Sequence, residues 1–520
     1  MSSSHPHPHD HPDQENEDDI YLDAGDAAEE IPADEDHPMD DDFSDDEAGH
    51  QEELSFQNDS LAHFDKHTDS LFCIAQHPLH PSITITGSGD DTAYIFDSAA
   101  DRPLLPRSYE SNPQPKGERE SLPAIAKLDG HTDSVNAVAF TEPAGEYVVT
   151  AGLDGKLRAW RDSSAQKNGT AWTFLAEVQE VEEINWVATC PAKSGGEENK
   201  NLIALGANNG SVWVYRIDAQ DESDPVSMVA CFFQHTESCT AGAWTPDGKL
   251  LATVSEDASF YVYDVFGAAA AAGVASPAGT QVVVGLTAQD QRFAVEGGLY
   301  SVAIAPTGAF AAVGGAEGHI KVVGLPRLPS STTAAAQTTS KSKAKSKAGG
   351  AAPAAGGGAG TLLASLQAQT DGIETLSFSS PPLTLLAAGS VDGSIALFDT
   401  AHRFAIRRHI RSAHEDTAVV KVEFVHDETA SAVQSAATGK SRSWLLTSVG
   451  MDGVVRRWDT RGGTAAAGYG LVKEWRGHLG MNENEEGEQS GGILGFVQGG
   501  EAGRRIVTAG DDGVALVFEE

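Results

Sequence analysis

The sequence has few of the features that mark secreted, membrane-spanning or nucleic-acid-binding proteins. It contains only four cysteines and no CxxC spacing, which disfavours a disulfide framework and favours a reducing compartment. The N-terminus has no apolar core, and no stretch approaches the roughly 20 apolar residues of a membrane span, so we expect neither a secretory leader nor a membrane anchor. Basic residues are scarce, with 35 Lys and Arg against 76 Asp and Glu. The net charge of -41 argues against nucleic acid as a direct partner and for a basic one.

Half of that charge lies at the N-terminus. Residues 1–53 hold 21 Asp or Glu and no Lys or Arg, which predicts a disordered acidic tail that solubilises the protein or attracts a basic partner. The HPHPHDHP run at residues 5–12 lacks cysteine and a second ligand cluster, so we expect no defined metal site and no cofactor. The composition favours the cytoplasm, with the nucleus as an alternative location, and a monomer.

The remaining chain is organised by a repeated unit, and the stretch from Gly130 to Trp160 is its fullest copy. Apolar residues there recur with period two, and Asp154-Gly155 predicts a tight turn between two strands. A turn acid or amide, followed six positions later by an aromatic or apolar residue, marks each copy. The eight copies are Asp90–Phe96, Asp154–Trp160, Asn209–Tyr215, Asp257–Tyr263, Glu317–Val323, Asp392–Phe398, Asp452–Trp458 and Asp512–Phe518.

This pattern resembles the WD repeat, in which each unit of about 40–45 residues forms one propeller blade. In a complete WD repeat, a His, a Thr or Ser, the turn Asp and a Trp form a hydrogen-bonded structural tetrad. Two units have all four residues: His131, Thr150, Asp154 and Trp160 in one, and His414, Ser448, Asp452 and Trp458 in the other. The His and the Thr or Ser recur in five units, whereas units three, five and six carry Leu205, Val313 and Ala388 and no matching His, which predicts blades held mainly by apolar packing. A His-Ser-Asp set that repeats in register is structural, because a catalytic site occurs once. We therefore predict that the protein is not an enzyme.

The chain ends two residues after Phe518, so the last unit has only three strands of its own. The run Leu61–Phe64 precedes the first unit and is expected to supply the missing outer strand, because a propeller must close to protect its sheet edges. We predict an all-β fold, a single eight-bladed WD-repeat propeller over residues 54–520. A low-complexity linker, residues 325–360, is inserted between blades 5 and 6. Its lysines, Lys341, Lys343, Lys345 and Lys347, suit a solvated linker better than a nuclear signal.

Acidic residues recur in the turns expected on one face, which we call the top face. This face carries the turn that leads into each inner strand and the turn with the repeated acid. The candidate partner-binding residues there are Asp69, Asp133, Glu182, Glu183, Glu237, Glu256, Asp371, Glu374, Glu415, Asp416 and Asp511. The last leading turn is enlarged and adds Glu483, Glu485, Glu486 and Glu488. Around a central channel these acids would attract an extended segment rich in Arg and Lys, although an acidic protein has acidic loops in any case.

Segments from several blades narrow the class further. VEEINWVATCP (181–191), AWTPDGKLLATVSEDASFYVYD (243–264), LLAAGSVDGSIALFDT (385–400) and VGMDGVVRRWDTR (449–461) resemble the angio-associated migratory cell protein family. The resemblance implies a dedicated chaperone that captures the basic N-terminal segment of a newly made large-subunit ribosomal protein and supports its delivery in ribosome biogenesis. Two alternatives remain. Trp458-Asp459-Thr460-Arg461 matches the WDxR pattern of cullin ubiquitin-ligase receptors, and a general signalling scaffold is compatible with any propeller.

Overall fold

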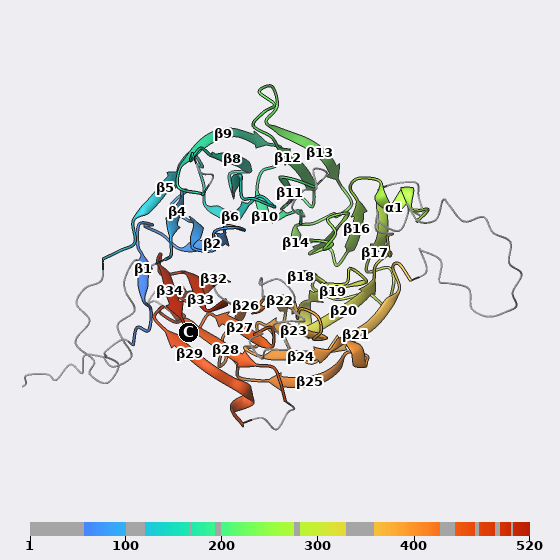
Figure 1. The fold of residues 1–520 in the computed structure, drawn as a ribbon. Helices are drawn as coiled ribbons and strands as arrows, with labels where there is room; N and C mark the ends of the chain where they lie inside the picture. Colours follow the sequence, from blue (N-terminus) through green and yellow to red (C-terminus); the bar gives the residue numbers. More distant parts are fainter. Residues whose placement is uncertain are drawn as a thin grey trace, which may run out of the picture. The chain divides into compact units, whose positions relative to one another are not determined.

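The computed structural model describes residues 57–99, 120–165, 168–192, 199–274, 281–328, 358–426, 442–462, 467–483, 489–500 and 503–520. These residues belong to one compact unit, Phe56–Glu520. They form eight four-stranded antiparallel sheets around a common axis (Figure 1), which confirms the predicted eight-bladed propeller. In these ranges no helix has the length and apolarity needed to cross a membrane. The predicted acidic tail, residues 1–53, lies outside them and stays a prediction.

Each blade is a meander that runs outward from an inner strand beside the axis. Blade 1 consists of β2 (Leu71–Gln76), β3 (Ile83–Ser88), β4 (Ala93–Asp97) and β5 (Ala124–Leu128). Blade 2 consists of β6 (Val135–Phe140), β7 (Tyr147–Gly152), β8 (Lys156–Asp162) and β9 (Trp172–Gln179). Blade 3 consists of β10 (Ile184–Thr189), β11 (Leu202–Ala207), β12 (Val212–Ile217) and β13 (Val226–Phe232). Blade 4 consists of β14 (Cys239–Trp244), β15 (Leu250–Ser255), β16 (Phe260–Asp264) and β17 (Val282–Leu286), with α1 (Ala268–Ala271) before its last strand.

The second half of the ring repeats this plan with short 3-10 turns. Blade 5 consists of β18 (Leu299–Ile304), β19 (Phe310–Gly315), η2 (Ala316–Gly318), β20 (His319–Gly324) and β21 (Leu362–Gln367). Blade 6 consists of β22 (Ile373–Phe378), β23 (Leu385–Ser390), β24 (Ile395–Asp399), η3 (Thr400–His402) and β25 (Ala405–Ile410). Blade 7 consists of β26 (Val419–Phe424), β27 (Leu445–Gly450), β28 (Val454–Asp459), η4 (Ala467–Gly470) and β29 (Leu471–Arg476). Blade 8 consists of β32 (Ile493–Gly499), β33 (Arg505–Gly510), β34 (Ala515–Glu519) and β1 (Ala62–Phe64).

The hydrophobic core is divided among the seams between neighbouring blades. One apolar cluster joins Val149 and Leu157 of blade 2 to Ile203 and Tyr215 of blade 3, and similar clusters lie at the other seams. A blade is therefore covered on both faces, so the second strand of most blades is buried along its whole length. This explains why β7 has no exposed face, although alternation in the sequence predicts a half-buried strand.

The ring is closed by the N-terminal strand, as predicted. Strand β1 pairs antiparallel with β34 of the C-terminal end, with Phe64 opposite Ala515. Phe64 is fully buried and stacks on Phe96 of blade 1, with ring centroids 4.4 Å apart and planes 8° apart. The three residues of β1 therefore complete the last blade and also fill the seam with the first.

All eight inner strands carry a β-bulge at the same place. The first residue of the inner strand pairs with a residue of the second strand of the blade. The second residue has no partner, and pairing resumes at the third. The residues left out are Phe72, Asn136, Asn185, Thr240, Tyr300, Glu374, Val420 and Leu494. A bulge re-aims its extra side chain, so each blade presents one additional residue close to the turn that leads into the inner strand.

The predicted 325–360 linker is shorter than its sequence suggests. Residues 325–328 and 358–360 are described: Leu325 is buried, and the Gly360 N–H donates to the Gly324 carbonyl at 2.9 Å. Blade 5 thus continues to residue 328 and resumes at 358. The four lysines of the linker lie outside the described residues.

Candidate functional site: the top face

The predicted tetrad of blade 2 is assembled by hydrogen bonds that use both ring nitrogens of its histidine. His131 Nδ1 lies 3.0 Å from Asp154 Oδ1, and His131 Nε2 lies 2.8 Å from Thr150 Oγ1. The indole N–H of Trp160 points to the same hydroxyl at 3.5 Å. Asp154 also accepts the backbone N–H of Thr132 at 3.0 Å. With both nitrogens engaged and the side chain buried, His131 ties the leading turn to the blade and has no free nitrogen to act as a base.

Blade 7 contains the same arrangement. His414 joins Asp452 and Ser448, each at 2.8 Å, and Trp458 donates to Ser448 Oγ at 2.9 Å. Burial lowers the pKa of the His414 imidazole, which keeps it neutral at physiological pH. Burial alone would raise the pKa of Asp452, but its bonds to His414 and Arg456 outweigh that effect and lower it.

Blade 6 differs from the prediction that it lacks polar support. Gln369 occupies the position of the missing histidine, and its amide donates to Ser394 Oγ at 3.1 Å and to the Ser394 carbonyl at 2.8 Å. The Thr370 N–H donates to Asp392 Oδ2 at 2.7 Å, as its counterpart does in blade 2. An amide can therefore replace the imidazole, and a search for histidine alone misses it.

The structure brings the eleven predicted acidic residues to one edge of the sheets. Because strands of a blade are antiparallel, the turn that leads into the inner strand and the turn between the second and third strands lie at the same end; Leu71 at the start of β2, for example, pairs with Ser88 at the end of β3. Ten of the residues lie in these turns, and Glu374 is the bulged residue of β22. Ten are exposed and Asp511 is half-buried.

The turns of successive blades interlock around the ring. Gly155 in blade 2 leaves no room for a side chain, because a methyl group there would lie 2.1 Å from the Val181 carbonyl in blade 3. Gly210, Gly393 and Gly513 pack in the same way against the leading turns of the blades that follow them. Their positive φ angles also favour glycine. The top-face turns of these neighbouring blades are thus held against one another.

The eleven carboxylates share one electrostatic property. Within the described parts of the chain none of them forms an ion pair, whereas acids elsewhere, such as Glu474 and Asp459, pair with arginine. Uncompensated carboxylates on one face create a negative field that attracts cations.

Some of the eleven also have a local structural task. Asp69, Asp133 and Asp371 each accept the N–H of the next residue at 2.7–2.8 Å, which stabilises their turns. Glu183 accepts the Asn208 amide at 2.8 Å, and Asp511 accepts the Gly491 N–H at 2.5 Å. Six of the acids make no side-chain hydrogen bond within the described residues: Glu182, Glu237, Glu256, Glu374, Glu415 and Asp416. These six are the least committed acids of the top face.

Three of the acids influence the same group where blades 4, 5 and 6 meet. The surrounding protein and the neighbouring Asp371 raise the pKa of Glu374, although this side chain is exposed to solvent. Burial raises the pKa of the Tyr300 phenol, and the carboxylates of Glu374, Glu256 and Asp371 raise it further. A cation placed here would face three carboxylates from two blades.

Asp91 is a top-face acid that the sequence interpretation missed. It follows the repeated acid of blade 1, at the position that glycine occupies in most blades, and has a left-handed φ of 62°. Burial raises its pKa, and Asp133 of the next blade adds to the effect. The replacement of the expected Asp-Gly by Asp90-Asp91 was the available sequence signal.

Other candidates lie elsewhere or contribute nothing further. The enlarged turn of blade 8 forms a small hairpin of β30 (Asn482–Glu483) and β31 (Gln489–Ser490), while Glu485, Glu486 and Glu488 lie outside the described residues. The histidine-rich run at residues 5–12 also lies outside them, and the part that is described holds no group of three His, Cys, Asp or Glu suited to a metal.

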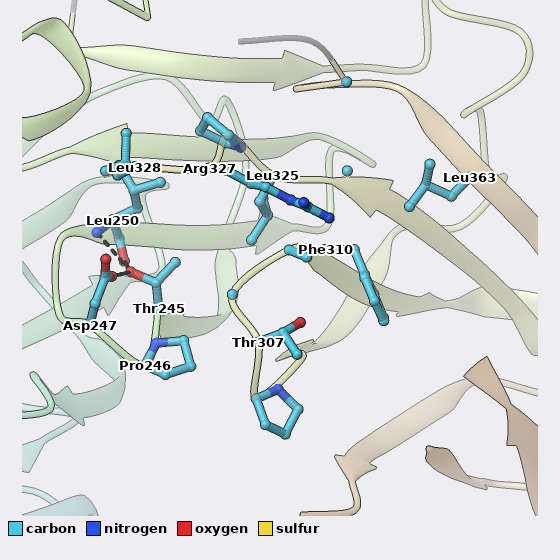
Figure 2. Close-up of a pocket in the computed structure, with 16 residues that line it drawn as sticks. Thr245, Pro246, Asp247, Leu250, Thr307, Phe310, Leu325, Arg327, Leu328 and Leu363 are labelled. Carbon is cyan, nitrogen blue, oxygen red and sulfur yellow. Dashed lines mark hydrogen bonds between the residues drawn. The ribbon is translucent and has the colours of Figure 1, made fainter. Parts of the chain in front are cut away.

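A cavity of about 1010 Å³ lies at the opposite edge of blades 4 and 5 (Figure 2). Its walls include Pro246 and Thr307 from turns between first and second strands, together with Leu325 and Arg327 beyond β20. Its acid, Asp247, accepts the Thr245 hydroxyl at 2.7 Å and is engaged within its own turn. This cavity is separate from the top face, because those turns lie at the other end of the strands.

The residues of the WDxR pattern make contacts within the chain. Trp458 belongs to the blade 7 tetrad, and Arg461 pairs with Asp459 at 2.6 Å and lies 4.1 Å from the centre of the Trp444 ring. These contacts do not favour a ligase-receptor interpretation. The fold and the unpaired acidic turns define a WD-repeat propeller with an acidic top face.

Comparison with known proteins agrees with this class. The WD domain, G-beta repeat family model matches residues 58–97, 123–161 and 360–399, and the anaphase-promoting complex subunit 4 WD40 domain model matches residues 197–276. The ribosome assembly protein SQT1 of Saccharomyces cerevisiae is 26% identical over 90% of this chain and 88% of its own. The human angio-associated migratory cell protein is 22% identical over 87% of this chain and 79% of its own.

A solved structure gives the stronger match. Chaetomium thermophilum Sqt1, crystallised with the N-terminus of the ribosomal protein L10 bound, is 50% identical to this chain. The match covers 89% of this chain and 100% of that one, with a TM-score of 0.71. The chain belongs to the Sqt1 family.

Proposed function

We infer that this protein is a dedicated chaperone that captures the basic N-terminal segment of a newly made large-subunit ribosomal protein, L10, and supports its delivery during ribosome assembly. The observation that carries this inference is the set of carboxylates without ion pairs in the top-face turns of seven blades. It occurs in a chain half identical to a propeller crystallised with the L10 N-terminus.

The chemistry of such a face suits this client. Arg and Lys side chains of an extended segment each find a carboxylate without displacing an existing ion pair. A newly made ribosomal protein carries basic segments that bind RNA non-specifically, and a negative face competes with RNA for them. We propose that the role is binding and not catalysis, and that capture takes place in the cytoplasm, where ribosomal proteins are synthesised.

We propose that the contacts are made by the eleven predicted acids and Asp91. The foremost candidates are the six whose carboxylates are least committed to the fold: Glu182, Glu237, Glu256, Glu374, Glu415 and Asp416. Asp511 and Glu183 have a second task in holding turns, so substitutions there would mix binding with stability.

Titration of the full-length protein with a labelled L10 N-terminal peptide tests the proposal. We expect saturable binding at a single class of site, with an affinity that falls as salt rises. A peptide of the same composition in scrambled order is the control for non-specific charge attraction. Equal affinity for the two peptides, or no binding to either, would contradict a dedicated chaperone.

A further inference from the structure

The inner-strand bulges reveal a feature of the top face that its charge does not explain. In blades 2, 3 and 4 the bulged residue ties its blade to the next one: Asn136, Asn185 and Thr240 each donate to the carbonyl of the first residue of the following inner strand, at 2.6–3.0 Å. The bulged side chain in these blades is therefore occupied by a structural bond.

In blades 1 and 5 that bond has passed to the next residue along the strand. Cys73 Sγ lies 3.4 Å from the Val135 carbonyl, and Ser301 Oγ donates to the Ile373 carbonyl at 2.6 Å. The bulged residues are thereby released from the seam, and both are aromatic: Phe72 and Tyr300. Phe72 is 41% exposed, unlike a core phenylalanine, and Tyr300 is half-buried.

Each of these two rings lies near a carboxylate, and the ring and the carboxylate both pack against the same glycine. A methyl group at Gly89 would lie 2.9 Å from Asp69 Oδ2 and 3.2 Å from Phe72 Cε2. A methyl group at Gly372 would lie 3.3 Å from Glu374 Oε1 and 3.6 Å from Tyr300 Cδ2. The two sites share one plan, an aromatic ring and an acid on the same small surface.

Neither ring is used inside the molecule. Among the described residues, no Lys or Arg lies over Phe72 or Tyr300 and neither ring packs on another aromatic, whereas Arg158 lies over Phe174 at 4.6 Å and Lys421 over Phe496 at 4.8 Å. The Tyr300 hydroxyl donates to the Gly297 carbonyl, which fixes the orientation of the ring. The Tyr300 ring is thus held in place, and neither ring has a cation over it within the described residues.

The two rings lie across the axis from each other. Blades 1 and 5 are four places apart in either direction round a ring of eight, and Figure 1 shows β2 and β18 on opposite sides of the ring's centre. We propose that Phe72 and Tyr300 are paired cation–π platforms, each receiving one Arg or Lys side chain of the client segment, which therefore crosses the top face from blade 1 to blade 5. This rests on the proposed function and adds to it the path of the segment and the residues that set its register.

The platforms give the face a selectivity that carboxylates alone lack. A guanidinium stacks on an aromatic face while it pairs with a neighbouring carboxylate, so arginine is the preferred occupant of both sites. A basic segment whose arginines have the wrong spacing would satisfy the acids but only one of the rings.

The test compares ring variants of the full-length protein for binding of the labelled L10 N-terminal peptide. Phe72→Leu and Tyr300→Leu are each expected to weaken binding by about 2- to 5-fold, and the double variant by about the product of the two. Phe72→Tyr, which keeps the ring, should retain affinity. Tyr469→Leu removes an aromatic ring that is 53% exposed in η4, at the opposite edge of the sheets, and should have no effect.

Peptides in which one cationic residue at a time is replaced by glutamine then identify the occupant. For each ring we expect one peptide for which the losses of binding free energy from the peptide substitution and from the ring substitution are not additive. Unchanged affinity of the double ring variant, or a loss that couples to no cationic residue, would overturn the platforms while leaving the chaperone proposal standing. Failure of the wild-type protein to bind the peptide would overturn both.

Discussion

The charge of the top face leads to a quantitative prediction for the variant Glu237→Gln with Glu256→Gln. Both side chains are exposed, neither accepts a hydrogen bond within the described residues, and glutamine keeps their size. The fold should therefore tolerate the change. A bound client replaces solvent around these acids, so each lost pair should cost about 1 kcal/mol, between the values for exposed and for desolvated pairs. Two pairs correspond to about a 30-fold increase in Kd at low salt.

Salt dependence separates this mechanism from a general loss of structure. The Debye length falls from about 10 Å at 0.1 M to about 3 Å at 1 M ionic strength, so the difference between wild type and variant should shrink to a few-fold at high salt. Fluorescence anisotropy gives Kd across the salt series. Stopped-flow mixing should show that much of the low-salt effect lies in the association rate, as expected for electrostatic steering.

A control of equal charge lies at the other end of the same sheet. Glu222 and Asp224 are exposed in the turn between β12 and β13, so Glu222→Gln with Asp224→Asn removes the same two charges away from the top face. Its Kd should stay within about 2-fold of wild type. An equal loss in both double variants would show that net charge and not the top face matters. A loss in the first variant that persisted unchanged at 1 M salt would refute the electrostatic reasoning.

Three further predictions concern stability and the strained turn. Phe64→Ala should destabilise the closed ring by about 3–5 kcal/mol in chemical denaturation, because it removes a fully buried ring from the seam of blades 8 and 1; a loss below about 1 kcal/mol would mean that closure does not depend on it. Burial lowers the pKa of His131, and it lowers the pKa of His77 from 6.5 to about 4. The unfolded chain therefore binds more protons in acid, and the free energy of unfolding should fall between about pH 6.5 and pH 4, by up to about 3 kcal/mol for His77. Denaturation midpoints that stay level over this range would contradict the prediction. Asp91→Gly should raise the free energy of unfolding by up to about 1 kcal/mol, because glycine adopts the left-handed φ without strain, and it should weaken client binding. Calorimetry measures the first effect and fluorescence anisotropy the second. A purely structural Asp91 would not give both.

The sequence predicts the fold well because the propeller repeats local patterns. The turn acid and the residue six positions later are fixed by one hairpin, so eight copies in register determine eight blades. Closure follows from counting strands, since the last unit lacks an outer strand and Leu61–Phe64 is left over. The positions of the acids on the top face are also predictable, because each acid belongs to a turn whose place in its blade is set by the neighbouring sequence.

Features that depend on contacts between separate turns or between blades are not predictable in this way. Gln369 replaces a histidine because the position requires only a donor that reaches Ser394, which is a matter of geometry between turns. Whether an acid is free or engaged, as Asp511 is by Gly491, depends on a contact 20 residues away. Phe72 and Tyr300 are released because the following residues, Cys73 and Ser301, make the hydrogen bonds to the next blades, and no pattern within one repeat predicts those bonds.

The closing strand has a consequence for how the protein is made. Phe64 is synthesised about 450 residues before its partner Ala515, so the ribosome produces one edge of the last blade first and the remainder last. At about 5–20 residues per second, the interval is roughly 20–90 s. During that time blade 1, which contains Phe96, the ring on which Phe64 stacks, lacks its neighbour blade 8. The protein thus has a long nascent phase, in which the seam of its first blade is still open.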